Sequence, residues 1–371
     1  MSEYQYYEFQ AIDRPLSTAD VKALRALSTR ARITNTSFTN TYHWGNFKGD
    51  PAKLMEQWFD LHLHLANWGT RCLMIRLPRR LVEQDQVEAF LRGHDIMRLW
   101  TNGDNLILSI GIDADDLDDD WDDSSRWLAE LAPLRTALLE GDLRVLYLVW
   151  LMAVEAEAVA PDETEPLPGL GPLTPALEAF ADFFAIDGDL VAAAAERDAQ
   201  PGPTGAAAGP IIAALTDQEK TGFLSRLFEG DALAVNDLRR LVRTRLPATA
   251  PVAARRAGDL RARAEAIRQA REQAEAKKIL AEQKQRDKAA SRALRARLDE
   301  IERRGDRVWA EIETEIQKRN VTGYDRTIFL LGDLKAIAEA KGTTDAFARR
   351  IADLRQRYAR RYTFIERLDR L

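Results

Sequence analysis

The segment from Val252 to Lys318 constrains the fold of this chain most, because it is predicted to form one long helix. It follows Pro247 and Pro251 and contains no proline, and its early Gly258 costs only about 1 kcal/mol relative to alanine. A helix of about 65 residues, at about 1.5 Å per residue, is on the order of 100 Å long. Such a helix cannot fold back into a compact core. We therefore expect it to connect two parts of the chain, to pair with another helix or to extend toward a partner.

The apolar residues divide this segment into three parts. From Arg268 to Arg292 the only large apolar residues are Ile279 and Leu280, so this part is predicted to be polar all round and held by charge pairs. Apolar residues return from Leu294 onward, where we expect packing. Three interpretations stay open: a solvated spacer, an antiparallel hairpin, and a zipper that forms a homodimer. A seven-residue spacing at the start predicts a thin coiled-coil seam of Leu260, Ile267, Ala274 and Ala281.

The net charge of −6 hides an asymmetry between the two parts of the chain. Residues 253–371 contain 30 Lys+Arg and 20 Asp+Glu, whereas residues 1–252 contain 23 and 39. An acidic front and a basic back are consistent with simple solvation, with contact between front and back, or with two different partners.

Composition bounds the class of protein. A length of 371 residues allows two or three domains, and 46% hydrophobic with 30% charged residues is normal for a globular chain. The start MSEYQYYEF lacks the features of a signal peptide. The longest apolar run, Val145 to Val154, is far shorter than the roughly 20 residues that span a bilayer and predicts a buried core helix. Cys72 is the only cysteine, which excludes an internal disulfide and fits a cytoplasmic protein.

Strand and helix signals alternate at the start of the chain and predict an α+β N-terminal domain. Asp50 and Pro51 are strong helix-start residues, and this helix is expected to continue to Asn67. Asn102-Gly103 predicts the turn of a β-hairpin. From Ser124 the chain is predicted to be all-α, and it ends in a helical hairpin broken at Gly342. The expected divisions are 1–112 (α+β domain), 113–123 (acidic loop), 124–200 (helical domain), 201–210 (flexible linker), 211–251 (helical pair), 252–318 (long charged helix) and 319–371 (C-terminal hairpin).

Catalytic and metal-binding patterns are weak. His62 and His64 are two residues apart on the predicted helix, so they are expected to point to different sides and not to share a metal. Cys72 lies in an apolar strand and is expected to be an inert hydrophobe. No nucleotide, nucleophile-elbow or zincin motif occurs, so we expect no catalytic residue, no cofactor and no metal.

The acidic run from Asp113 to Asp123 has no EF-hand spacing and is expected to be a solvated loop. Divalent-metal binding is the alternative. A hidden metal-dependent hydrolase would have to use its aspartates, Asp115, Asp118 and Asp120.

Two groups of residues are the best candidates for binding. The aromatic loop TYHWGNFKG predicts either a recognition loop or a loop that packs its own rings. The basic C-terminal helices combine arginines with aromatics, which predicts phosphate binding and base stacking or else ordinary solubilising charge. The candidates are Tyr42, His43, Trp44 and Lys48 in the loop and Arg349, Arg350, Arg357, Arg360 and Arg361 in the tail.

Two stretches resemble known bacterial proteins. The opening YYEFQAIDRPL with YHWGNFKGDP resembles the N-terminus of a group of uncharacterised bacterial proteins, which implies no particular chemistry. The tail YDRTIFLLGDLKAIAEAKG with FARRIADLRQRYARR resembles helical hairpins on bacterial proteins that include some with SWIM-type zinc fingers. The finger is absent, because one cysteine cannot supply its ligands. This second resemblance implies only a packing or interaction module.

These observations lead to two expected functions. The first is a non-enzymatic interaction or scaffold protein of a bacterial multiprotein system, in which the long helix separates head and tail binding surfaces. The alternative is a nucleic-acid-associated accessory subunit that binds through its basic C-terminal helices. Protein partners are expected in the first case and nucleic acid in the second, with no membrane in either.

Overall fold

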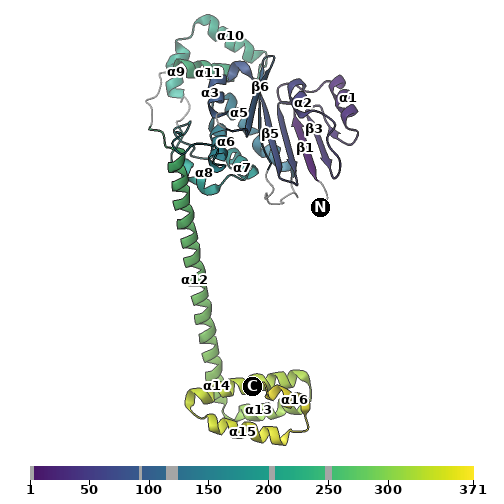
Figure 1. Cartoon of the computed structure of the whole chain (residues 1–371), viewed down its shortest axis with the longest axis vertical. Helices are drawn as coiled ribbons and strands as arrows, with labels where there is room; N and C mark the ends of the chain where they lie inside the picture. Colours follow the sequence, from purple (N-terminus) through teal and green to yellow (C-terminus); the bar gives the residue numbers. More distant parts are fainter. Residues whose placement is uncertain (1–3, 92–93, 114–123, 200–204, 247–252) are drawn as a thin grey trace. The chain divides into compact units, whose positions relative to one another are not determined.

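The computed structural model describes residues 4–91, 94–113, 124–199, 205–246 and 253–371 (Figure 1). The chain divides into two compact units, Met1–Ala270 and Arg271–Leu371, which we call unit 1 and unit 2. The long helix α12, Ala257–Arg304, belongs to unit 1 at its start and to unit 2 from Arg271.

Unit 1 contains one seven-stranded sheet with the order β2-β3-β1-β4-β5-β7-β6, and all neighbouring strands are antiparallel. This arrangement confirms the predicted α+β start of the chain, including the β6–β7 hairpin at Gly103. The strands are β1 Gln5–Gln10, β2 Arg32–Ile33, β3 Ser37–Tyr42, β4 Leu61–Ala66, β5 Thr70–Pro78, β6 Met97–Asn102 and β7 Asn105–Asp113.

Helices cover both faces of the sheet in unit 1 (Figure 1). The N-terminal helices are α1 Thr18–Leu27, α2 Pro51–Gln57 and α3 Gln84–Glu88, with short 3-10 turns η1 Arg79–Leu81, η2 Ala89–Leu91 and η3 Ser124–Arg126. The later ones are α4 Trp127–Leu131, α5 Pro133–Leu139, α6 Arg144–Glu155, α7 Pro175–Phe183, α8 Gly188–Ala195, α9 Gly205–Ala213, α10 Asp217–Phe228 and α11 Ala234–Arg245.

The alternation of side chains along the strands gives the sheet two different cores. On one face, leucines such as Leu63 and Leu73 pack against α4 to α8, so the predicted helical domain shares its core with the sheet. On the other face, Phe9 and Phe38 pack against α1 and α2. The run Val145–Val154 in α6 is buried on all sides, as its composition predicts.

The helix expected from Asp50 to Asn67 is wrong in its second half. It ends at Gln57, and Leu61–Ala66 forms strand β4 between β1 and β5. The sequence LHLHLA alternates with period two, and pairing on both edges favours the strand over the helical spacing of its leucines. His62 and His64 therefore point to the same face of the sheet, contrary to the expectation.

The linker expected at 201–210 is also wrong where the structure describes it. Helix α9 begins at Gly205 and includes Pro210. Three consecutive alanines, Ala206–Ala208, favour a helix strongly enough to continue through these breakers. Residues 201–204 lie outside the described residues.

Unit 2 is a bundle built on the last turns of α12. Its core contains Ile301, Ile312 and Leu331, which confirms that the apolar residues after Leu294 pack. Helices α14 and α15 form the expected C-terminal hairpin, with Gly342 in the left-handed conformation between them. The other helices are α13 Asp306–Gln317, α14 Val321–Lys341, α15 Thr344–Arg357 and α16 Tyr362–Leu368.

The single helix predicted as far as Lys318 is wrong at Gly305, which separates α12 from α13. Gly305 has φ 51° and ψ −130°, a combination that residues with a β-carbon rarely adopt. The chain changes direction at this break, and Val308, Ile312 and Ile316 of α13 are buried in unit 2.

We predict that Gly305→Ala destabilises unit 2 by on the order of 1–3 kcal/mol, because alanine is strained at this φ and ψ. The matched control is Gly332→Ala in the interior of α14, where a β-carbon would lie 3.9 Å from Leu371. Alanine should leave stability there unchanged or raise it by about 0.5–1 kcal/mol. Denaturant unfolding monitored by circular dichroism measures both, and equal effects would contradict the role of Gly305.

Candidate functional site

The aromatic loop after β3 is anchored on its inner side. Tyr42 is half-buried and packs edge-to-face on Tyr7, with ring centroids 5.9 Å apart. Phe47 packs on Phe9 and its neighbours in the core below α1 and α2. The side-chain amide of Gln5 donates to the Gly45 carbonyl oxygen at 3.1 Å. The loop therefore packs some of its own rings, as one of the two predictions states.

The outer side of the same loop carries exposed groups. His43 and Lys48 are exposed, and Trp44 keeps 69% of its surface in solvent. The guanidinium of Arg30 lies over the Trp44 ring at 5.1 Å. An exposed tryptophan beside an arginine, on an anchored loop, is the residue pairing typical of a protein-binding hot spot.

The tail arginines do not form one free basic surface. Arg350 pairs with Asp306 at 2.9 Å, and Arg357 pairs with Glu313 at 2.7 Å. Arg361 donates to the Ile316 carbonyl and lies over Tyr358. Arg349 donates to a carbonyl of its own helix, and Arg360 is exposed with no ion pair among the described residues. Three of these five arginines thus already contact acidic or carbonyl groups of helix α13 in unit 2.

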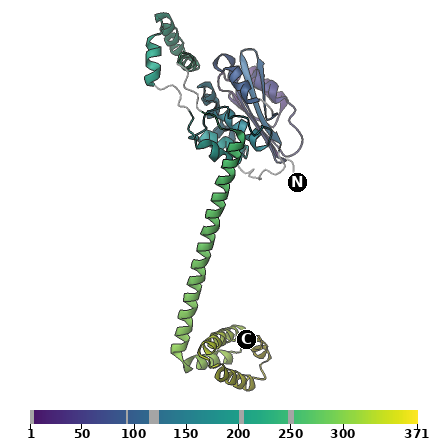
Figure 2. The same cartoon turned by 60° about the vertical axis from the view of Figure 1, so that its left-hand side comes forward.

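Helices α9, α10 and α11 expose an apolar surface that the sequence analysis missed. Leu224, Leu227 and Phe228 of α10 are 65%, 44% and 94% exposed, and no residue of α10 is buried. Ile212 of α9 and Val235 of α11 are also exposed. Figure 2 shows these teal helices at the edge of unit 1. The signal was present as an i, i+3, i+4 spacing, but the same spacing occurs in any core-facing helix.

A groove in unit 1 lies among α4, α5 and α7. It has a volume of about 1050 Å³, an apolar floor that includes Leu134 and Leu177, and acidic residues such as Glu130, Glu178 and Asp182. None of its lining residues is a histidine, cysteine or lysine. The groove therefore offers a contact surface but no nucleophile with an adjacent base.

His62 and His64 are packed as aromatic rings. His62 stacks on Phe9 with centroids 3.9 Å apart, and its Nδ1–H donates to the Glu8 carbonyl at 2.9 Å. His64 stacks on Tyr7 at 4.2 Å. Burial lowers the pKa of His62 to about 3 and that of His64 to about 4, so both rings are neutral near pH 7.

Cys72 lies beside His64 on the neighbouring strand, with its Sγ 3.8 Å from the Ser109 hydroxyl. Burial raises the pKa of its thiol to about 11, which keeps it protonated near pH 7. A nucleophilic cysteine needs the opposite shift. The geometry supports the expected role of Cys72 as a small packing residue.

No group of three or more His, Cys, Asp or Glu side chains could hold a metal ion within the part of the chain that the structure describes. Of the acidic loop expected at 113–123, Asp113 is the last residue of strand β7. Residues 114–123, including Asp115, Asp118 and Asp120, lie outside the described residues. None of the described helices is long and apolar enough to cross a membrane.

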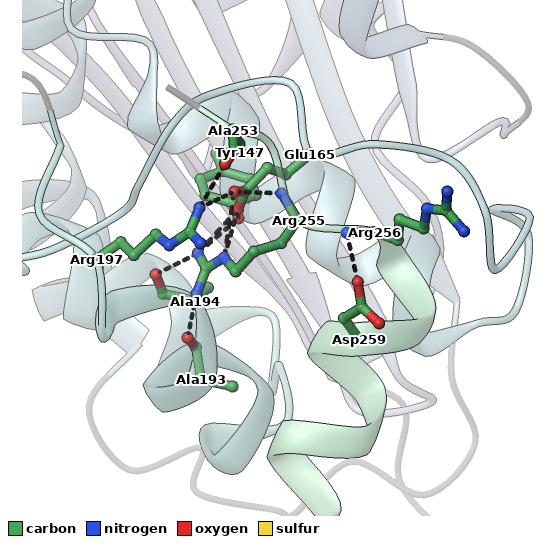
Figure 3. A network of polar contacts seen from close by, with 9 residues as sticks. All are labelled: Tyr147, Glu165, Ala193, Ala194, Arg197, Ala253, Arg255, Arg256 and Asp259. Carbon is green, nitrogen blue, oxygen red and sulfur yellow. Dashed lines mark hydrogen bonds and ion pairs between the residues drawn. The ribbon is translucent and has the colours of Figure 1, made fainter. Parts of the chain in front are cut away.

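A buried polar network fixes the chain just before α12 (Figure 3). The Glu165 carboxylate is fully buried, and the Arg255 guanidinium pairs with it at 2.8 Å. Tyr147 donates its hydroxyl to Glu165 at 2.5 Å, and Arg197 approaches the same carboxylate at 3.4 Å. Burial, followed by this neighbouring carboxylate, raises the pKa of Tyr147. Because the carboxylate is saturated with donors, it is suited to holding structure and not to acting as a base.

Arg255 also joins this network to helix α8. Its guanidinium donates to the carbonyl oxygens of Ala193 at 2.7 Å and Ala194 at 2.9 Å, in the last turn of α8 (Figure 3). Its backbone N–H donates to Glu165 at 2.9 Å. One arginine therefore ties the connection before α7, the end of α8 and the start of α12 together.

The first turns of α12 continue this attachment. Leu260 and Ala264 are buried and Ile267 packs against the same core, so half of the expected coiled-coil seam is covered by unit 1. Gly258 approaches the Pro161 carbonyl so closely that an added β-carbon would lie 3.0 Å from the oxygen. The absence of a β-carbon at Gly258 therefore permits this close packing, although glycine is unfavourable in a helix.

No known protein family, no curated protein and no solved structure matches this chain. The two bacterial resemblances therefore stay predictions.

We predict that Arg255→Met costs about 3–5 kcal/mol, because it leaves the Glu165 carboxylate buried without its main partner. The matched control is Arg263→Met, two turns further on, which removes the solvent-exposed pair with Glu196. That change should leave the melting temperature nearly unchanged, since exposed pairs contribute little. Thermal unfolding of the two variants is the measurement, and equal melting temperatures would contradict the role of Arg255.

The histidine packing predicts acid sensitivity. Above pH about 6.5 His64 is neutral in both states, but below it the unfolded chain binds a proton that the folded chain rejects until about pH 4. In that window each such histidine lowers the free energy of unfolding by up to about 1.4 kcal/mol for each unit by which the pH falls. We expect His64→Phe, which keeps a ring on Tyr7, to flatten the fall in stability between pH 6.5 and 4.5. Parallel stability curves for variant and parent would rule this account out.

Proposed function

We propose that this chain is a non-enzymatic interaction protein, a scaffold in a bacterial multiprotein assembly. In this proposal unit 1 binds a protein partner, and α12 connects unit 1 to the helical bundle of unit 2. A single cysteine, whose buried thiol stays protonated near pH 7, is consistent with a cytoplasmic location.

The observation that carries the proposal is the apolar surface of α10. Phe228 is 94% exposed, and Leu227 and Phe228 follow Leu224 by three and four residues, so the three side chains share one side of the helix. Removing such side chains from water contributes about 1.5–3 kcal/mol each. Exposed apolar groups that are gathered on one helix, and not scattered singly, mark an interaction site.

The Trp44 loop supports the same proposal independently. Its inner residues are fixed by Gln5 and Phe47, so Trp44 is held in place before a partner arrives. Binding then costs less conformational entropy than it would on a mobile loop. The loop residues Tyr42, His43, Trp44 and Lys48 remain our contact candidates, with Tyr42 acting as support because it is half-buried.

Nucleic-acid binding through the tail arginines is the weaker alternative. Arg350, Arg357 and Arg361 contact acidic or carbonyl groups inside unit 2, so their charge is already compensated. Releasing Arg350 and Arg357 to bind phosphate would remove two ion pairs between α13 and α15. This surface therefore gives the alternative little support.

The test is affinity capture from the native host, with the full chain as bait and quantitative mass spectrometry. Phe228→Glu places a charge in the apolar surface, and Gln218→Glu adds the same charge at another exposed position of α10. We expect Phe228→Glu to lower capture of a specific protein by more than about 30-fold, the effect of losing a hot spot. Gln218→Glu should capture it as well as the parent does.

Two outcomes of this experiment decide against the proposal. Equal capture by both variants would remove α10 from the interface, and recovery of the parent chain with no specific protein would contradict a scaffold role. If light scattering instead shows a dimer of the parent that Phe228→Glu dissociates, the partner is a second copy of this chain.

A further inference from the structure

The middle of α12 presents a run of charged side chains that are exposed in the structure as it is described. Every residue from Gln269 to Arg297 is exposed, although the helix is continuous from Ala257 to Arg304. Residues 271–297 contain 9 Lys+Arg and 4 Asp+Glu. All of these residues belong to unit 2.

Five of the basic residues form one narrow line, which we call the basic stripe. Successive residues of an α-helix are turned by about 100° about its axis. Positions 7, 11, 15 and 18 residues after a first residue therefore lie, together with that residue, within an arc of about 80°. The stripe is about 27 Å long, from the rise of about 1.5 Å per residue. Its members are Lys277, Lys284, Lys288, Arg292 and Arg295.

The acidic residues of this part lie off the stripe. Between Lys277 and Arg295 the only ones are Glu282 and Asp287, and both fall outside the arc. With the residues that the structure describes, the side chains of the five stripe residues form no hydrogen bond or ion pair, in contrast to the tail arginines. The helical period therefore separates the basic residues of this part from its acidic residues.

We propose that the basic stripe of α12 binds the phosphate backbone of duplex DNA without reading its sequence. Duplex DNA carries one negative charge per about 1.7 Å of its axis, so the stripe faces about eight base pairs. Cations in a line at spacings of about 5–10 Å can each neutralise a phosphate and release a counterion. Residues 1–252 are acidic, so the attraction is local to this helix and does not arise from the net charge of the chain.

The chemistry of the stripe favours DNA over a membrane or a protein. From Arg271 to Arg297 the large apolar residues are Ile279, Leu280 and Leu294, and they do not form the continuous apolar face that holds a helix on lipid. A protein interface would need buried anchors, and lysine, which supplies three of the five stripe residues, is depleted there.

The width of the helix favours DNA over double-stranded RNA. An α-helix with its side chains is about 10–12 Å across, which matches the B-form major groove of about 12 Å. The major groove of A-form RNA is too deep and narrow for side chains to enter. The helix can therefore lie along a DNA groove and contact the phosphates at its edge.

Fluorescence anisotropy of the full chain with a labelled duplex of about 20 base pairs tests the proposal, at 50 to 200 mM salt. Five phosphate contacts predict a slope of about −4.5 for log affinity against log salt, or a loss of about 500-fold over this range. Lys284→Gln with Lys288→Gln should reduce the slope by about 1.8. Circular dichroism would verify that the variant stays helical.

The matched control is Lys278→Gln with Arg286→Gln, which removes the same charge from the same helix but off the stripe. We expect its slope to equal that of the parent. Equal weakening by both pairs, tighter binding to an RNA duplex of the same length, or no binding at 50 mM salt would each overturn the proposal. Because these positions are far in sequence from α10, loss of DNA binding and loss of the protein partner are separate results.

Discussion

The attachment of α12 depends on one buried ion pair, between Glu165 and Arg255. Its cost of desolvation is offset because Tyr147, the α8 carbonyls and the Arg255 backbone supply further hydrogen bonds. Once Arg255 is fixed, Leu260 and Ala264 follow into the core of unit 1. From Arg271 to Arg297 every residue of the helix is exposed in the described structure, so this part is supported mainly by its own hydrogen bonds and by residues of high helix propensity.

Local patterns predicted much of the fold. The long helix, the β6–β7 hairpin, the buried α6 and the C-terminal hairpin each have a signal within one window of sequence, and the structure confirms them. Strand β4 could not be predicted from one window of sequence, because the spacing of its leucines also fits a helix. Only its pairing with β1 and β5 favours the strand over the helix. The break at Gly305 could not be predicted from local sequence either. The residues around it favour a helix, and only the φ of Gly305 in the structure shows the break.

The candidate surfaces were partly predictable for similar reasons. The exposed Trp44 was found from composition, whereas the apolar side of α10 has a core-like pattern and only its exposure shows otherwise. The Glu165–Arg255 pair joins residues far apart in sequence, so no local pattern reveals it. The basic stripe was present in the sequence, but it forms a surface only because residues 269–297 of the helix are exposed in the described structure. Exposure is thus the property that turns these patterns into proposed contact sites.

The central claim is that α12 is anchored firmly at its start and is helical without a covering partner in its middle. Hydrogen exchange of the isolated full chain, followed by mass spectrometry, tests this most directly. Amides of residues 260–267 should exchange almost as slowly as those of the buried helix α6, and amides of 272–296 should exchange far faster through local opening. Equally slow exchange in both segments would mean that the middle of α12 is covered, and would contradict this account.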